Sequence, residues 1–103
     1  MPETDVYQAI AHPARRALLD ALRVNELPVR ELAGLFDSSR PATSQHLRVL
    51  LAAGLVSERR EGRENLYRLT AEPLGQVSHW IGFYEEFWAS RLRDLRTVVD
   101  GLE

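Results

Sequence analysis

The run from Asp37 to Arg68 reads DSSRPATSQHLRVLLAAGLVSERREGRENLYR, and its first part predicts a short helix. Ser38 or Ser39 can cap this helix, Pro41 suits its first turn, and Gly54 suits its end. One side of the helix carries residues with helical spacing that can pack: Thr43, Leu47, Leu50 and Leu51. The opposite side is small or polar: Pro41, Gln45, Arg48 and Ala52, flanked by Ser44. Because Arg, Gln and Ser reach base edges and phosphates from a helix in the major groove, we interpret this segment as a DNA-reading helix, called the reader helix below.

Two short strand-like runs follow, Leu55–Arg60 and Glu64–Leu69, with Gly62-Arg63 between them as a tight hairpin turn. Four arginines surround the predicted tip: Arg59, Arg60, Arg63 and Arg68. Such a hairpin alone would also fit an unrelated small domain with a solvated turn. A helix followed by an arginine-bearing hairpin has the layout of a winged helix-turn-helix, with the helix-turn-helix at about 28–53 and the wing at about 55–69.

The chain has 103 residues, a length that predicts a single domain, 1–103. It contains no cysteine, which excludes disulfides and thiolate metal sites. No apolar run approaches the length of a membrane span and no signal peptide opens the sequence, so we expect a cytoplasmic protein.

The formal net charge of −2 is unusual for a nucleic-acid binder, but the charge is unevenly distributed. Residues 36–70 hold six arginines against four acidic residues, and the rest of the chain holds seven arginines against eleven. Positive charge is therefore concentrated in the predicted reader helix and wing, as DNA binding requires.

Three helices are predicted before the reader helix. Asp5–Ala11 and Pro13–Arg23 are separated by His12-Pro13, because the residue before a proline avoids the helical region. A third helix is opened by Pro28. Its predicted core stripe consists of Val29, Leu32, Ala33 and Phe36.

The last predicted helix runs from Leu74 to about Leu102 and has more apolar surface than so small a domain can bury. An apolar seam in it steps at intervals of 4, 3, 4 and 3: Trp88, Leu92, Leu95, Val99 and Leu102. The helix could pack on its own core, but a seam of this kind favours contact with a second subunit. An aromatic set lies within the same helix: Trp80, Phe83, Tyr84, Phe87 and Trp88. These rings could line a pocket for an effector of unknown identity, although core or dimer packing is the simpler interpretation.

From Tyr7 to about Leu74 the sequence resembles the ArsR family of bacterial winged-helix repressors. The matching motifs are His12-Pro13-Ala14-Arg15-Arg16, Glu26-Leu27-x-Val29-x-Glu31-Leu32-Ala33, Pro41-x-x-Ser44-x-His46-Leu47-x-x-Leu50, Ala53-Gly54-Leu55-Val56 and Glu61-Gly62-Arg63-x-x-x-Tyr67-x-Leu69. The resemblance implies a homodimeric repressor on a two-fold-symmetric operator, with dimerisation through the first and last helices. The expected dimerisation residues are Val6, Ile10, Trp80, Tyr84, Trp88, Leu92, Leu95 and Val99.

The sequence departs from the metal-sensing members of that family. Many of these have two cysteines flanking the valine that corresponds to Val29, where this chain has Pro28 and Arg30. The last helix offers one histidine, His79, with carboxylates at Glu85, Glu86 and Asp94. A lone histidine beside aromatic residues is more often packed or solvated than a ligand, so we expect no metal site and no cofactor.

The predicted function is sequence-specific DNA binding, as a transcriptional repressor of other genes and of its own. The residues expected to contact DNA are Ser39, Arg40, Ser44, Gln45, His46, Arg48, Arg60 and Arg63. For His46 a hydrogen bond within the motif is an equal alternative. A winged helix used as a protein-interaction module is the competing function, since a fold does not dictate its use. An enzyme is disfavoured, because the sequence shows no catalytic or phosphate-binding motif.

Overall fold

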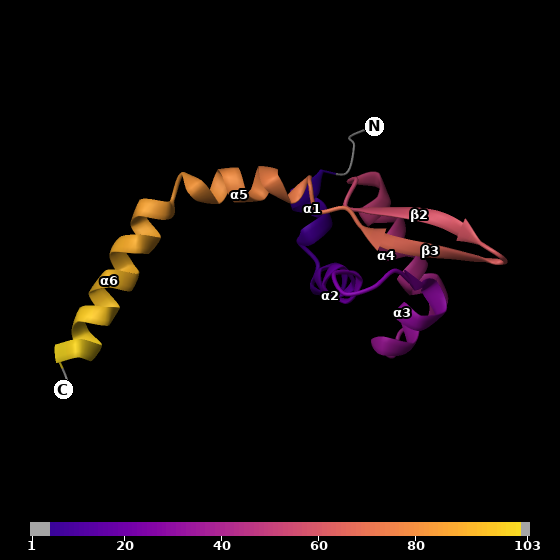
Figure 1. Ribbon diagram of the computed structural model, residues 1–103, viewed down its shortest axis with the longest axis horizontal. Coiled ribbons are helices and arrows are strands. Elements are labelled where there is room, and N and C mark those ends of the chain that lie inside the picture. The colour runs from indigo at the N-terminus through magenta and orange to yellow at the C-terminus, as the bar shows by residue number, and fades with distance from the viewer. Residues whose placement is uncertain (1–4, 102–103) are drawn as a thin grey trace.

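The computed structural model describes residues 5–101, apart from the side chains of Thr97 and Asp100. The elements follow in the order α1 (Val6–Ile10), α2 (Pro13–Leu22), β1 (Leu27–Pro28), α3 (Val29–Leu35), α4 (Arg40–Ala52), β2 (Val56–Glu61), β3 (Glu64–Leu69), α5 (Leu74–Gly82) and α6 (Glu85–Gly101). The prediction of a mainly helical chain with a β-hairpin wing is confirmed (Figure 1).

The helices begin where local chemistry favours a helix start. The Nδ1 atom of His12 accepts a hydrogen bond from the Ala14 N–H (3.1 Å), which makes His12 the cap of α2 and Pro13 its first residue. The Ser39 hydroxyl accepts from the Ala42 N–H (3.2 Å) and caps α4, the reader helix. Pro28 is itself the cap residue of α3, so that helix begins one residue later than predicted.

A residue with left-handed backbone follows the C-cap residue of both α3 and α4. Asp37 has φ 49°, and beside it the Ser38 N–H donates to the Ala33 carbonyl (3.0 Å). Gly54 has φ 75°, and the following N–H, that of Leu55, donates to the Leu50 carbonyl (2.9 Å). Each of these hydrogen bonds closes a six-residue turn and satisfies a carbonyl at the end of its helix. The chain therefore changes direction sharply after α3, in the turn of the helix-turn-helix, and after α4, where the wing begins.

The wing belongs to a three-stranded antiparallel sheet with the order β1-β3-β2. Strands β2 and β3 pair from Val56↔Leu69 to Glu61↔Glu64, so Gly62-Arg63 is the two-residue turn, as predicted. The two-residue strand β1 was not predicted. Its pairing of Leu27 with Tyr67 fixes the start of α3 against the base of the wing.

The hydrophobic core lies among α1–α4 and the base of the sheet. Its fully buried large side chains are Leu32, Leu47, Leu50 and Leu55. The predicted packing stripe of α4 is confirmed for Thr43, Leu47 and Leu50, which are buried, and Leu51 is partly buried against the same core. Phe36 departs from the prediction for α3: it lies just past the helix and is 40% exposed, because the chain turns there toward α4.

The prediction of a single helix from Leu74 to about Leu102 is wrong, because the helix breaks after Gly82; residue 102 lies outside the described residues. The N–H groups of Phe83 and Tyr84 donate to carbonyls three residues back, those of Trp80 and Ile81. Glycine is a poor helix former, and two carboxylates in the first turn of α6 suit a helix N-terminus. The helical spacing of apolar residues continues through the junction between α5 and α6, so the sequence pattern does not indicate the break.

Helix α6 projects away from the rest of the molecule (Figure 1). The whole molecule, α6 included, measures 60 × 35 × 20 Å. The radius of gyration is 18.0 Å, whereas a compact chain of this length would have about 13 Å. Leu74 and Val77 at the start of α5 pack against the core, and Tyr7 of α1 contacts Trp80 edge to face. Within residues 5–101, no helix is both long enough and apolar enough to cross a membrane.

Candidate nucleic-acid interface

The start of the reader helix and the tip of the wing line one groove of about 330 Å³. The lining residues are Pro28, Val29, Arg30, Arg40, Ser44, Arg63, Glu64, Asn65 and Tyr67. Three of them, Arg40, Ser44 and Arg63, are residues that the sequence predicted to bind DNA. Arginines beside a helix N-terminus form a surface suited to anions, because the guanidinium groups and the helix dipole both favour negative charge.

The remaining predicted contact residues do not line this groove and lie in different settings. Gln45 and Arg48 are exposed on α4, on a helix whose Thr43, Leu47 and Leu50 are buried. Ser39 is exposed, with its hydroxyl engaged in the cap. The Arg60 Nε–H donates to the Gly62 carbonyl (3.1 Å) at the exposed tip of the wing.

Arg30 of α3 also lines the groove and was not predicted as part of it. Its guanidinium donates to the Glu64 carboxylate and holds the pKa of that carboxyl below its usual value, with a smaller contribution from Arg40. Glu64 is therefore ionised within an arginine-lined groove. No local pattern in the sequence indicates this contact, because the two partners are 34 residues apart and meet only in the folded chain.

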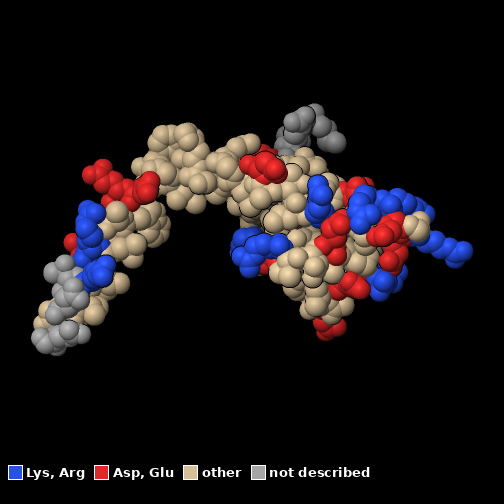
Figure 2. Space-filling view, in the orientation of Figure 1, with Lys and Arg blue, Asp and Glu red and all other residues tan. Residues whose placement is uncertain are grey.

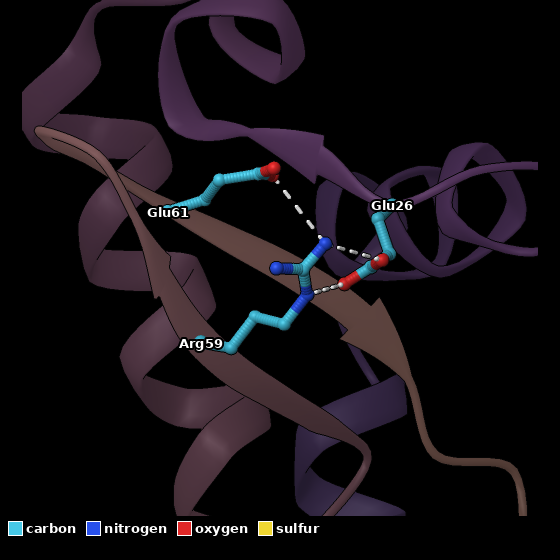
Figure 3. A network of polar contacts seen from close by, with 3 residues as sticks. All are labelled: Glu26, Arg59 and Glu61. Carbon is cyan, nitrogen blue, oxygen red and sulfur yellow. Dashed lines mark hydrogen bonds and ion pairs between the residues drawn. The ribbon is translucent and has the colours of Figure 1, made fainter.

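Arg59 differs from the other wing arginines because two carboxylates surround it (Figure 3). Its Nε and Nη2 atoms lie 2.9 and 3.1 Å from the two oxygens of Glu26, and Nη2 lies 3.4 Å from Glu61. The hydrogen bonds from Arg59 lower the pKa of Glu26. The charge of Arg59 is thus balanced locally, which leaves Arg60 and Arg63 as the better candidates for DNA contact.

Charged side chains are interspersed over the wing end of the molecule in Figure 2, where blue and red atoms alternate. In the same view the surface of α5 is uncharged. The molecule therefore has a charged end that contains the groove and an uncharged middle toward α6.

His46 packs against α2 rather than facing solvent alone. Its ring lies 4.6 Å from the His12 ring, centroid to centroid, and its Nδ1 is 3.3 Å from Nη1 of Arg15. Because an arginine only donates, Nδ1 must accept, which requires a neutral imidazole with its proton on Nε2. Burial lowers the pKa of His46 below 6.5, and the charges of His12 and Arg15 lower it further. Of the two predicted roles for His46, these contacts favour the hydrogen bond within the motif.

Acidification should therefore destabilise the protein through His46. The pKa of this residue is lower in the folded state, so below pH 6.5 the unfolded chain binds a proton that the folded chain does not. Stability contributed by neutral His46 is present above pH 6.5 and is lost as the pH falls toward the folded-state pKa. Urea unfolding at pH 7.5, 6.5 and 5.5 should show a smaller loss for His46→Gln than for wild type, with His79→Gln on α5 as control. Identical pH dependence in the wild type and His46→Gln would contradict this.

The predicted dimerisation residues fall into two groups. Val6 is only 3% exposed and belongs to the core of its own subunit, so this residue is not available to a partner, and Ile10 is partly buried against the same core. An i, i+4 apolar pair does not reveal which core it joins. The predicted residues on α5, α6 and the turn between them are at least half exposed: Trp80, Tyr84, Trp88, Leu92, Leu95 and Val99.

The aromatic residues at the α5–α6 junction form an open apolar hollow of about 460 Å³, lined by Trp80, Ile81, Tyr84, Phe87 and Trp88. Phe83, which the sequence grouped with these rings, is 73% exposed and does not line the hollow. His79 stacks edge to face on Phe83. Among residues 5–101, His79 and the nearby carboxylates do not gather into a group that could hold a metal ion; the predicted absence of metal stays a prediction.

A capped reader helix, a preceding helix joined to it by a sharp turn, and an arginine-tipped hairpin beside it define a winged helix-turn-helix protein. A sequence profile described as "Bacterial regulatory protein, arsR family" matches residues 12–58. Over 94 residues the chain is 37% identical to the HTH-type transcriptional regulator Rv2034 of Mycobacterium tuberculosis, covering 91% of this chain and 85% of that protein. The chain belongs to the ArsR family of bacterial transcriptional regulators.

Two further relatives are informative. The transcriptional repressor SdpR of Bacillus subtilis is 32% identical over 77 residues, covering 75% of this chain and 86% of the repressor. The homodimeric winged helix-turn-helix DNA-binding domain Mb0332 of Mycobacterium bovis is 27% identical, covers 84% of this chain and 80% of its own, and superposes with a TM-score of 0.65. The family resemblance predicted from the sequence motifs is confirmed.

Proposed function

We propose that this protein is a transcriptional repressor that binds an inverted-repeat operator as a homodimer and also represses its own gene. The observation that carries the proposal is the shared groove, in which Arg40 and Ser44 of the reader helix meet Arg63 of the wing. SdpR, a relative of similar length, is itself a repressor. A repressor acts where the DNA is, so the proposal places the protein in the cytoplasm.

The two elements have different roles in this proposal. Gln45 and Arg48 on α4 read base edges in the major groove, since amide and guanidinium groups make paired hydrogen bonds there. Arg60 and Arg63 on the wing contact the phosphate backbone or the minor groove, and Ser39, Arg40 and Ser44 contact phosphates at the helix start.

Dimerisation is supported by the apolar surface that α5 and α6 leave uncovered. The exposed fractions of Trp88, Leu92 and Leu95 are 57%, 64% and 61%, which is unusual for side chains of this size in succession on one helix. A second copy of the chain, packed on the same surface around a two-fold axis, would bury it. The related Mb0332 domain is homodimeric.

The proposed repressor does not sense metals through thiolates, because the chain has no cysteine. The signal that relieves repression is then a different chemical class or a change in protein level. No enzymatic activity forms part of the proposal.

Replacing Gln45 and Arg63 separately should distinguish base reading from backbone contact. Gln45→Ala should relax sequence preference at its base pair, at a cost of about 1–3 kcal/mol. Arg63→Ala should weaken binding to all sequences alike and reduce the slope of log affinity against log salt by about one. Fluorescence anisotropy on the operator and on single-base variants of it, at several salt concentrations, measures both effects.

Arg59→Ala is the matched control on the wing, because carboxylates already balance its charge, and its salt slope should stay close to that of the wild type. A change of preference in Arg63→Ala without one in Gln45→Ala would reverse the assignment of the two elements. Wild-type protein that binds every duplex equally would support the competing role as a protein-interaction module.

A further inference from the structure

The Arg15 side chain connects three helices, α1, α2 and α4, through its hydrogen bonds. It lies on α2, and its Nε–H donates to the Ala9 carbonyl of α1 (2.6 Å) while Nη2 donates to the Gln8 carbonyl (3.0 Å). Its third nitrogen, Nη1, donates to Nδ1 of His46 on the reader helix (3.3 Å). One planar, charged group therefore holds the end of α1 and the middle of α4 at the same time.

The interface between α2 and α4 is incompletely packed beside the Arg15–His46 hydrogen bond. A hollow of about 150 Å³ lies between α2 and α4, and its walls include Ala14, Ala17, Thr43 and His46. Apolar side chains therefore leave the α2–α4 interface incompletely filled beside His46, and the hydrogen bond from Arg15 adds to the His12–His46 ring contact in holding the two helices there. Arg15 is partly buried, and a partly buried, charge-assisted hydrogen bond is stronger than one in water.

The other side of α1 is attached to α5. The Tyr7 hydroxyl donates to the Gln76 carbonyl (3.1 Å), and the Tyr7 ring packs on Trp80. Helix α1 is therefore bound to the proposed dimerisation segment on one side and, through Arg15, to the reader helix on the other.

We propose that Arg15 is a positioning residue for DNA recognition, which fixes the reader helix relative to α1 through His46. It does not touch DNA in this account; it sets the orientation in which Gln45 and Arg48 meet the bases. The inference rests on the proposed DNA-binding function. It predicts that loss of the three hydrogen bonds from Arg15 lowers discrimination between operator and other DNA and leaves the affinity for non-specific DNA unchanged.

Arg15→Lys is the informative variant, because lysine keeps the charge but lacks the planar fork that reaches three acceptors. Arg16→Lys is the matched control. Arg16 caps α1 in the same way, by donating to the Ile10 carbonyl (2.7 Å), and in the described part of the chain no hydrogen bond from it to α4 is seen. The expected result is about tenfold weaker operator binding for Arg15→Lys, with affinity for scrambled duplex and its salt slope unchanged. Arg16→Lys should resemble the wild type in all three.

A second variant tests whether Arg15 acts through His46. His46→Leu removes the acceptor, so it should weaken operator binding by a similar factor, and the double variant Arg15→Lys/His46→Leu should be no weaker than the worse of the two single variants. Additive losses of operator affinity in the double variant would overturn the proposal. An equal loss of operator affinity in Arg16→Lys would also overturn it, because Arg15 would then act only as a cap of α1.

Amide hydrogen exchange provides a measurement independent of DNA. Exchange in α4 should be faster in Arg15→Lys than in the wild type and unchanged in Arg16→Lys. Wild-type protein that failed to discriminate operator from scrambled duplex would contradict the proposed function. The exchange rates of α4 would still test whether Arg15 holds α4 in place, because they are measured without DNA. Unchanged exchange in α4 of Arg15→Lys would overturn that role.

Discussion

Leu95→Glu is expected to convert the protein to a monomer that no longer binds its operator tightly. In the proposed dimer this side chain lies in the apolar seam of α6, so the change buries two unpaired carboxylates near the two-fold axis. An uncompensated buried charge costs about 3–5 kcal/mol, which weakens the dimer by about 100-fold or more. Each subunit should still fold, because α6 lies outside the core formed by α1–α4 and the sheet. Analytical ultracentrifugation and operator binding measure the two effects.

Ser90→Glu provides the control for Leu95→Glu. It places the same carboxylate on α6, on the face opposite the seam, at a residue that is exposed. This variant should remain a dimer and bind the operator as the wild type does. Two results would contradict the assignment of the seam: wild type that is monomeric at micromolar concentration, or a monomeric Leu95→Glu that binds the full operator undiminished.

Leu47→Ala is expected to have the largest effect on stability of the folded subunit. Leu47 is fully buried on the packed face of the reader helix, and truncating such a leucine costs about 2–5 kcal/mol. Small domains have about 5–15 kcal/mol of stability in total, so a large part of the margin would be lost. Urea unfolding at a fixed protein concentration measures the change.

Leu35→Ala makes the same chemical change on α3 at a residue that is 62% exposed, and it should cost less than about 0.5 kcal/mol. Equal losses for Leu47 and Leu35 would mean that α4 does not present Leu47 to the core. The exposed face of the reader helix would then have to be reassigned as well.

The reader helix and wing could be predicted from the sequence because their signals are local. Ser39, Pro41 and Gly54 fix the two ends of α4 within a few residues, and Gly62-Arg63 fixes the turn of the hairpin. The buried stripe of α4 follows from spacing alone. Arg40, Ser44 and Arg63 were selected as separate contact residues by chemistry, and the fold brings them to one groove.

The features that sequence reasoning missed depend on contacts between distant segments. Arg15 reaches His46 across 31 residues, and Arg30 reaches Glu64 across 34, so no window of local sequence shows either pair. The burial of Val6 has the same origin, since its apolar spacing fits its own core and a partner equally well. The break after Gly82 was missed for another reason: the apolar periodicity continues through it, and the helix-start signal of Glu85 and Glu86 is easily read as ordinary helix surface.

Selection of bound sequences from a pool of randomised DNA duplexes tests the central claim most directly. Two reader helices related by a two-fold axis should enrich an inverted repeat whose half-site centres lie about 10 base pairs, or about 34 Å, apart. Replacing one half-site of the enriched sequence should abolish tight binding, because one reader helix contacts too few base pairs for specific recognition. Enrichment of a single unrepeated motif bound by one subunit, or of no motif at all, would contradict the account.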